Sequence, residues 1–286
     1  MNISCVIPTH NRNAFLLEAI RSAMAQTFPA FEIIVVNNGE QTIDAADKTL
    51  SNVKIVETVR DAGVSQARNI GATVAKGQYI AFLDDDDLWH SEYLEKAVIE
   101  LKNGAECIIS RVDKLLEGNV IPYKNPDGNL TIEYLLTRNP GITGSNIVID
   151  KRTFLSIGGF DTDLPPSEDK AFMLEILTSN IKTVILPENQ VLHRIHKTDR
   201  LTDNPDKRYR GTSLFVKKYR SLMNRQMLRY NMMKAYKYKS LAGCRFALIQ
   251  FMILKTIYRL SILLGKEKYG NVYVFKNKKS KLRELH

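Results

Sequence analysis

The sequence has little cysteine and no long uninterrupted apolar run. Its cysteines, Cys5, Cys107 and Cys244, are odd in number and have no C-x-x-C spacing, which argues against a disulfide framework and a cysteine-bound zinc ion. No window reaches 18 uninterrupted apolar residues, and the nearest, 240–265, is broken by three basic side chains. We therefore predict no membrane-spanning helix.

Glycine and proline are also scarce, at 15 and 9 of 286 residues, whereas 44% of the residues are hydrophobic. This composition excludes collagen-like and disordered chains and allows a sizeable core. The length is about twice a usual domain of ~150 residues, so we expect one large domain with an appendage, or two domains. The opening MNISCVIPTHNR lacks the basic and apolar regions of a signal peptide, so we expect a protein of the reducing cytoplasm.

Charge is distributed unevenly along the chain. Residues 1–199 hold 19 Lys and Arg against 27 Asp and Glu, and residues 200–286 hold 22 against 4. An acidic body with a basic C-terminal region indicates that catalysis and anchoring lie in different parts of the chain.

The first 110 residues alternate apolar, β-rich runs with helical patterns. The predicted strands are 3–8, 31–36, 54–58, 78–83, 106–110 and 145–150. The predicted helices are 13–26, 64–75, 91–103, 151–157 and 168–179. This alternation predicts an α/β fold with a mostly parallel central sheet flanked by helices on both faces. Residues 111–143 read as an irregular region over the site, and the chain reads as helical from about 206 to 264.

Polar clusters follow three of the predicted strands, at 8–11, 37–39 and 84–87. Ligands of open α/β sheets bind beyond the carboxyl ends of the strands, so we expect these clusters to meet there. The run of four aspartates at 84–87 is the strongest signal, because adjacent carboxylates repel one another unless cations neutralise them. A divalent cation with oxygen ligands would do this, and Mg²⁺ or Mn²⁺ often bridges carboxylate and phosphate. The alternative is a solvated acidic turn in which Asp87 caps the next helix.

Several motifs together resemble family 2 glycosyltransferases with the GT-A fold. They are VIPTHNR at 6–12, VVNNGE at 35–40, DAGVSQARNIGATVAKGQYIAFLDDDD at 61–87, GGFD at 158–161, SED at 167–169 and HRIH at 193–196. The resemblance covers roughly residues 1–200, and it rests on the order and spacing of the set because each motif alone is weak. It divides the chain into a GT-A domain at 1–205 and a basic amphipathic helical region at 206–286.

This resemblance implies an inverting transfer from a nucleotide-diphosphate sugar with Mn²⁺ or Mg²⁺. The implied nucleotide-binding residues are Pro8, Thr9, Asn38, Arg68, Asp84 and Asp85, with Thr9 and Asn38 flanking the base and Pro8 shaping the strand exit. Asp84 and Asp86 match the family's D-x-D acids, and Asp86 is the implied metal ligand. Asp169 matches the catalytic base, with Glu168 beside it, and His196 matches a histidine near the metal or diphosphate.

The chemistry supports these roles independently. A diphosphate leaving group gains negative charge that a divalent ion stabilises, and the attacking hydroxyl must lose a proton to a carboxylate. Each residue also has a simpler interpretation. Asp169 could be a helix N-terminal acid, Arg68 could pair with Asp61 or an acidic loop, and His196 could be a surface residue. Trp89 could pack under the acidic loop or stack on a ligand.

One departure from the family pattern concerns the base. Members commonly carry two acids after the second strand, where this chain has Asn37 and Asn38. An asparagine can accept or donate a hydrogen bond, so uridine is favoured while guanosine, thymidine and cytidine donors stay open.

The basic region 214–239 interleaves Lys and Arg with Tyr, Met and Leu. It lacks a nucleic-acid recognition motif, so we expect no nucleic acid and favour peripheral contact with the anionic cytoplasmic face of the inner membrane. The alternative is a helical appendage that packs on the body or forms an oligomer.

The predicted function is transfer of a sugar, with a UDP-sugar favoured, to a hydroxyl of a glycan or lipid-linked glycan in surface polysaccharide or lipopolysaccharide synthesis. Two alternatives stay open. A sugar-nucleotide nucleotidyltransferase would need a Gly-rich basic loop after the first strand, and VIPTHNR is neither Gly-rich nor strongly basic. An inactive sugar-nucleotide-binding scaffold protein would fit the Asn pair but not the intact acid run.

Overall fold

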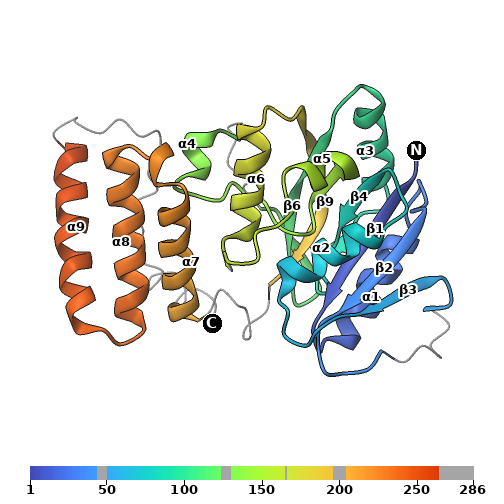
Figure 1. Cartoon of the computed structure of the whole chain (residues 1–286), viewed down its shortest axis with the longest axis horizontal. Helices are drawn as coiled ribbons and strands as arrows, with labels where there is room; N and C mark the ends of the chain where they lie inside the picture. Colours follow the sequence, from blue (N-terminus) through green and yellow to red (C-terminus); the bar gives the residue numbers. More distant parts are fainter. Residues whose placement is uncertain (44–49, 124–129, 165, 196–203, 264–286) are drawn as a thin grey trace.

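The computed structural model describes residues 1–43, 50–123, 130–164, 166–195 and 204–263. Figure 1 shows a sheet with its helices at one end and a row of three helices at the other. Candidate residue His196 lies outside the described residues.

The first half of the sheet is parallel. Strands β1 (Ile3–Thr9), β2 (Glu32–Asn37), β3 (Val53–Glu57) and β4 (Tyr79–Phe82) pair in the order β3-β2-β1-β4. Every residue of β1 is buried, because neighbouring strands flank it and helices cover both of its faces. Helix α1 (Asn13–Met24) follows β1, and α2 (Val64–Val74) follows β3. The carboxyl ends of these four strands therefore lie along one edge.

The second half of the sheet is mixed. Strand β8 (Ile147–Asp150) pairs antiparallel with β4 and with β6 (Cys107–Leu116). Strand β9 (Thr183–Arg194) runs parallel to β6, and the short β5 (Leu88–Trp89) pairs antiparallel with β9. Strand β7 (Asn119–Ile121) forms a hairpin with β6. The predicted α/β fold with a central sheet is confirmed, with antiparallel pairings added in this half.

Helices cover both faces of the sheet and bury two apolar clusters. One face packs against α1 and α3 (Tyr93–Lys102), and its cluster includes Ile7, Ile20 and Leu94. The other face packs against α2, α5 (Lys151–Ser156) and α6 (Glu168–Thr178). Alternate β1 residues supply the two clusters, as the two-residue period of a strand requires.

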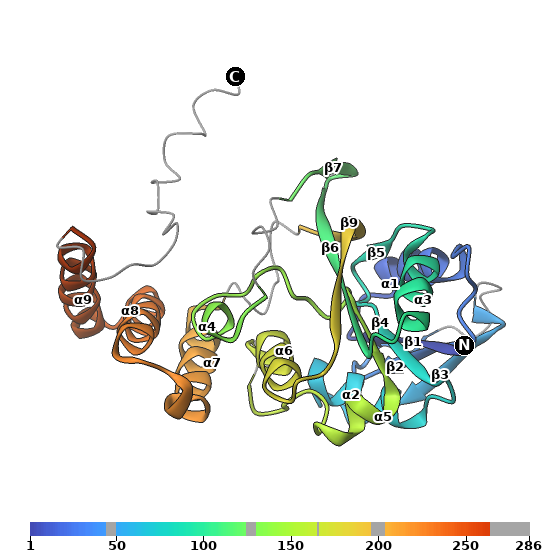
Figure 2. The same ribbon diagram turned by 90° about the horizontal axis from the view of Figure 1, so that it is seen from above.

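Three helices continue from the body, namely α7 (Pro205–Lys218), α8 (Arg225–Leu241) and α9 (Arg245–Leu263). Figure 2 shows them as a row leading away from the sheet, with α7 nearest to α6 and to the short α4 (Ile132–Leu135). The second apolar cluster extends into this row through Phe215, Tyr219, Met223 and Met227. A domain boundary at 205 stays a prediction, because this cluster crosses it. No helix of the described chain is long and apolar enough to cross a bilayer.

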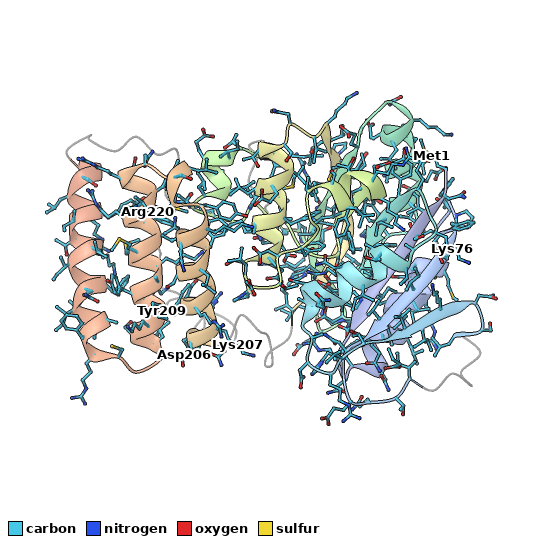
Figure 3. All side chains as sticks on the ribbon, viewed as in Figure 1. Met1, Lys76, Asp206, Lys207, Tyr209 and Arg220 are labelled. Atoms are coloured by element: carbon cyan, nitrogen blue, oxygen red, sulfur yellow. The ribbon has the colours of Figure 1, made fainter. Side chains whose placement is uncertain are left out.

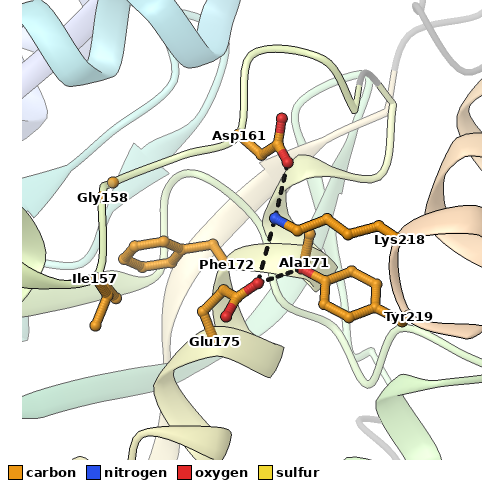
Figure 4. A pocket seen from close by; sticks show the side chains of 9 residues that line it. Ile157, Gly158, Asp161, Ala171, Phe172, Glu175, Lys218 and Tyr219 are labelled. Atoms are coloured by element: carbon orange, nitrogen blue, oxygen red, sulfur yellow. Dashed lines mark hydrogen bonds and ion pairs between the residues drawn. The ribbon is translucent and has the colours of Figure 1, made fainter. Parts of the chain in front are cut away.

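Polar contacts also fix α7 on α6. Figure 4 shows Lys218 between Asp161 and Glu175, with the hydroxyl of Tyr219 donating to Glu175. The Lys218 ammonium is 2.9 Å from the Asp161 carboxylate and 3.2 Å from that of Glu175. These contacts pin the C-terminal end of α7 to the body.

Three sequence predictions differ from the structure. The region 111–143 is not wholly irregular, because β6 runs on to Leu116 and is followed by β7 and α4. Strand β9 was not predicted, since Pro187 and Asn189 interrupt its pattern. In the structure its register with β6 shifts near these residues, and Arg111 donates to the carbonyl of Pro187. Asp87 does not cap α3, whose N-cap is Glu92.

Candidate active site

The acidic run lies at the carboxyl edge of the sheet, directly after β4, and its four members point in different directions. Asp87 is buried, accepts hydrogen bonds from the Ser145 hydroxyl and the Arg194 amide, and lies 3.1 Å from Nδ1 of His193. Asp85 turns back toward β1, where it accepts from the Thr9 hydroxyl at 2.7 Å. These two carboxylates hold the loop in place. Asp84 and Asp86 remain partly exposed toward the site, with side chains 23% and 17% accessible.

Two arginines neutralise the partly exposed aspartates. Arg68 Nη2 lies 2.5 Å from Asp84 Oδ1, and Arg12 Nη1 contacts Asp86 and lies 3.5 Å from Asp85. Burial, and next the charge of Asp86, raise the pKa of Asp85 to about 7. Burial of Asp85 therefore opposes its ionisation, and Arg12 and the Thr9 hydroxyl oppose this rise in its pKa. Arg12, within the VIPTHNR motif, was not predicted as a site residue, although its position just after β1 places it opposite the acidic run.

Arg68 joins the acidic run to the N-terminus of α6. Its side chain is 2% exposed, and Nη1 lies 3.2 Å from Asp169 Oδ1 and 3.9 Å from Glu168 Oε1. Burial opposes the charge of Arg68, but Asp84, Asp169 and Glu168 raise its pKa above the usual range. The ring of Phe160, from the GGFD motif, lies 5.0 Å from the guanidinium carbon. Arg68 is thus a permanent cation shared by three carboxylates.

Asp169 is held at this junction with about a quarter of its side chain exposed. Burial and then the neighbouring Glu168 raise its pKa well above the usual range, while Arg68 opposes the rise. A carboxylate with raised proton affinity is a better proton acceptor than an ordinary aspartate, provided that it is ionised when substrate binds. His193 of β9 also acts on Asp169 electrostatically, so the HRIH segment does approach the site through this residue.

A backbone of small residues makes room for this cluster. Gly144 lies so close to the Arg68 guanidinium and Asp84 that a Cβ at this position would overlap both. Gly159 has a φ of +69°, and a Cβ there would lie 2.6 Å from Asn69 Oδ1. Asn69 in turn accepts from the Phe160 amide and donates to its carbonyl. The GGFD turn therefore fixes Phe160 over Arg68.

The ends of β1 and β2 form the neighbouring part of the edge. Pro8 and Thr9 end β1, and Asn38, which is 4% exposed, follows β2. The backbone N–H of Asn38 donates to the Thr9 carbonyl, but the side-chain Oδ1 of Asn38 is buried with no hydrogen-bond partner. An orphaned buried acceptor usually has a missing ligand or water. Asn37 differs, since its Oδ1 accepts from Gly39 and its Nδ2 donates to Glu57.

The structure decides between the alternatives stated for Trp89 and Arg68. Trp89 packs under the acidic loop, where it is 4% exposed and donates from Nε1 to the Ser145 carbonyl. Arg68 pairs with the acidic loop and not with Asp61. The structure thus brings together Pro8, Thr9, Asn38, Arg68, Asp84, Asp85, Asp86 and Asp169 at one edge.

The carboxylates at this edge suit a hard divalent cation of the kind the resemblance implies. Among the described residues, no group of three or more His, Cys, Asp or Glu side chains could hold a metal ion alone. Mg²⁺ commonly binds through one or two carboxylates and completes its shell with substrate phosphates and water. Asp84 and Asp86 therefore fit an open site that the diphosphate of a donor would complete.

This α/β fold, with its acidic loop at the carboxyl edge, is of the GT-A glycosyltransferase type. Residues 4–153 match the model of the family described as Glycosyl transferase family 2, and the chain belongs to this family. The prediction made from the motifs is confirmed.

Curated relatives are similar over the N-terminal part of the chain. An uncharacterized glycosyltransferase of Haemophilus influenzae is 30% identical over 181 residues, 61% of this chain and 62% of that protein. An uncharacterized glycosyltransferase of Rickettsia felis is 29% identical over 61% of this chain and 31% of that protein. The chain thus spans less than two thirds of these relatives. The Escherichia coli protein WfgD, named as a UDP-Glc:alpha-D-GlcNAc-diphosphoundecaprenol beta-1,3-glucosyltransferase, is 27% identical over 62% of this chain and 70% of that protein.

Solved structures show the same fold over more of the chain. Residues 1–349 of TarS from S. aureus, in complex with UDP-GlcNAc, align with a TM-score of 0.64 at 18% identity. The alignment covers 89% of this chain and 79% of that one. At this identity the likeness shows the fold alone.

Proposed function

We propose that this protein is an inverting glycosyltransferase that moves a hexosyl or hexosaminyl group from a UDP-sugar to a hydroxyl of a lipid-linked glycan in surface polysaccharide synthesis. The observation that carries the proposal is the Arg68 junction, which unites the D-x-D acid Asp84 with Asp169 across the carboxyl edge of the sheet. Two relatives support the substrate classes. WfgD is named for UDP-Glc and a diphosphoundecaprenol-linked sugar, and TarS was solved with UDP-GlcNAc.

The proposed donor site follows from the geometry of the edge. The buried, unsatisfied Oδ1 of Asn38 would accept a hydrogen bond from the base, and Pro8 and Thr9 form the adjoining wall. The Thr9 hydroxyl donates its hydrogen bond to Asp85. Thr9 and Asp85 would therefore shape the site, and other residues would contact the ligand. Asp84 and Asp86 would hold Mg²⁺ or Mn²⁺, with the predicted ligand His196 beyond the described residues. The ion would supply charge that stabilises the leaving diphosphate.

Asp169 is the proposed base. In a single displacement the acceptor hydroxyl attacks the anomeric carbon as the bond to the diphosphate oxygen breaks, and the hydroxyl proton passes to the Asp169 carboxylate. One base suffices, and the configuration at the anomeric carbon inverts. Arg68 opposes protonation of Asp169 by holding a positive charge 3.2 Å from Oδ1. Arg12, whose side chain is 34% exposed beside Asp86, would also face the diphosphate.

A transfer assay tests this proposal. The purified protein would be incubated with Mn²⁺, a panel of UDP-sugars and a short-chain alkyl-diphospho-GlcNAc, and the products followed by mass spectrometry. We expect one sugar to be added, with the anomeric configuration opposite to that of the donor by NMR. Retained configuration would contradict the inverting mechanism, and UDP binding without any transfer would favour an inactive sugar-nucleotide-binding scaffold.

We also propose that α9 docks on the anionic cytoplasmic face of the inner membrane. One side of α9 exposes a continuous apolar stripe whose members, at helical spacing, are Ile249, Met252, Ile253, Ile257 and Leu260. Arg245, Lys255 and Arg259 are the helix's charged residues, and 225–263 contains no Asp or Glu. Apolar side chains with only cationic neighbours match a bilayer rich in anionic lipid.

Vesicle flotation tests this docking. Wild-type protein should float with phosphatidylglycerol vesicles and be released in part by high salt, which screens charge attraction. Ile249→Glu with Ile253→Glu should abolish flotation, whereas Val59→Glu, at an exposed apolar position of the body, should not. If the double variant instead turns a dimer into a monomer and leaves flotation intact, the stripe is an oligomer interface.

A further inference from the structure

A buried lysine that has no counter-ion among the described residues lies beside the proposed base. Lys170 of α6 is 7% exposed, and its ammonium lies 3.3 Å from the ring centroid of Phe215 on α7. It forms no ion pair or hydrogen bond with any residue that the structure describes. Burial, and then the charge of Lys234, lower the pKa of Lys170 well below the usual range. The fold therefore keeps an ammonium group where its charge is costly.

More cations gather around this position from three other parts of the chain. Lys234 of α8 lies four residues from Tyr230 and four from Tyr238, and Arg138 and Arg208 lie over these two rings. The charges of Arg208, Arg138 and Lys237 act on Lys234. Burial, and then these charges, lower the pKa of Lys234 to about 8. Like Lys170, Lys234 has no carboxylate partner among the described residues. The whole of 225–263 is free of Asp and Glu, so α8 supplies no neutralising acid.

Such a cluster has a physical cost that apolar residues would avoid. A buried charge that lacks a partner destabilises the fold, and an apolar side chain of similar volume is usually tolerated better. Here the basic groups come from α6, α7, α8 and the segment after α4, and each guanidinium stacks on a tyrosine, Arg138 on Tyr230 and Arg208 on Tyr238. Lys170 is buried, and Lys234, Arg208 and Arg138 are partly buried. Pre-positioned cations of this kind are what a bound phosphate would neutralise.

The position of Lys170 relative to Asp169 indicates which substrate would supply the phosphate. Lys170 is the next residue of α6, and the two side chains point to different neighbours, Asp169 to Arg68 and Lys170 to α7. In the proposed donor site, the cation for the diphosphate would be Arg12, whose side chain is 34% exposed beside Asp86. An acceptor whose hydroxyl reaches Asp169 would have its remaining groups on the side of α7 and α8.

We propose that Lys170, Lys234 and Arg208 form an anion site for the phosphate or diphosphate of the acceptor. This inference rests on the proposed function and deepens it, because it assigns the acceptor a chemical class, a sugar carried on a phosphate. The same phosphate chemistry is present in membrane lipid headgroups and in free phosphate, so the test separates these sources.

Calorimetric titration with two matched probes tests the proposal. The first probe is a short-chain alkyl-diphospho-GlcNAc, and the second is the same alkyl GlcNAc glycoside without phosphate, each added with UDP and Mn²⁺ already saturating. Lys170→Met and Lys234→Met should each weaken binding of the diphosphate probe about tenfold, the usual size of one charge-assisted contact. Binding of UDP and of the neutral probe should not change.

The control is Lys76→Met. Lys76 is an exposed lysine on the body, and Figure 3 places it at the far side of the molecule from Tyr209 and Arg220 of the C-terminal helices. This variant should bind both probes as wild type does. Equal weakening of both probes by Lys170→Met, or no weakening of the diphosphate probe, would overturn the proposal. So would a wild-type protein that binds the two probes equally.

Two further arms separate the sources of phosphate. If the cluster binds lipid headgroups, the variants would lose flotation with phosphatidylglycerol vesicles and keep the soluble diphosphate probe, which overturns the assignment to the acceptor. If it binds any free anion, inorganic pyrophosphate alone would bind the wild type as tightly as the diphosphate probe and would lose this binding in Lys170→Met, which overturns it too. Failure of the proposed function would be seen separately, as an absence of UDP binding to the wild-type protein before either probe is added. Folding of each variant is checked by its thermal midpoint, which should not fall, since a costly charge is removed.

Discussion

Arg68 and Asp169, 101 residues apart in the chain, meet at 3.2 Å, and the same guanidinium holds Asp84 at 2.5 Å. The contact ties the strand that ends in the acidic loop to the helix that begins with the proposed base. A buried charge network of this kind is strongly destabilised when one member is removed, because its partners stay buried without compensation. Arg68 therefore sets both the stability of the site and the charge state of its carboxylates.

Removal of Arg68 should be costly. Arg68→Ala leaves Asp84, Glu168 and Asp169 without their shared cation, so we expect the free energy of unfolding to fall by about 3–5 kcal/mol. Chemical denaturation measures this fall. Arg60→Ala is the matched control, since Arg60 is exposed and lies 3.9 Å from its partner Glu40, and should change stability by less than ~0.5 kcal/mol. A similar small effect for Arg68→Ala would show that the network is not a structural junction.

Replacement of the proposed base should separate binding from chemistry. Asp169→Asn removes the proton acceptor but keeps the side-chain shape, so we expect kcat to fall about 10²–10⁴-fold. Calorimetry should find donor binding within a factor of a few of wild type. Asp163→Asn, at an exposed position in the preceding loop, should leave the rate unchanged. Full activity of Asp169→Asn would rule out this residue as the base.

Asn38 should contribute to recognition of the base. Its buried Oδ1 has no partner, so Asn38→Ala should weaken UDP binding about tenfold through the loss of one hydrogen bond to a buried group. Binding of inorganic pyrophosphate, which has no base, is the internal control and should be unaffected. An unchanged affinity for UDP would place the base elsewhere along the edge.

Lys234 should make stability depend on pH in the alkaline range. Its pKa is about 8 in the folded protein, against a usual 10.5, mainly because of burial. Between these values the unfolded chain binds more protons than the folded one, so the contribution of Lys234 to stability rises with pH. Lys234→Met should therefore be more stable than wild type at pH 7, and this advantage should shrink as pH rises from 8 to 10. Urea unfolding at several pH values measures it, and a difference that stays constant would contradict the assignment.

The sequence predicted which residues meet at the carboxyl edge of the sheet, because its motifs are local. Asp84 and Asp86 follow a strand whose buried apolar run is easily read, and Asp169 lies in the first turn of a helix with a clear apolar pattern. The contacts that position these residues join segments far apart in the chain, so local sequence patterns did not predict them. Arg12 reaches the acidic run across 74 residues, and Lys170 meets Phe215 through helix packing that no local pattern specifies.

The second half of the sheet escaped prediction for a related reason. Strand β9 contains Pro187 and Asn189, which are poor strand formers, yet it pairs with β6 over most of its length. Tertiary pairing overrides local propensity here, with a register shift that accommodates the irregular residues. The extension of β6 to Leu116 likewise depends on β9 and β7 as partners.

The most direct test of the account is a calorimetric titration of the protein with UDP, in Mn²⁺ and after chelation, repeated on Asp86→Ala. We predict binding that requires Mn²⁺ and is weaker by at least tenfold in the variant, with GDP, dTDP and CDP binding less tightly than UDP. Failure of all four nucleotides to bind with Mn²⁺ present would contradict the assignment of this edge as a sugar-nucleotide site.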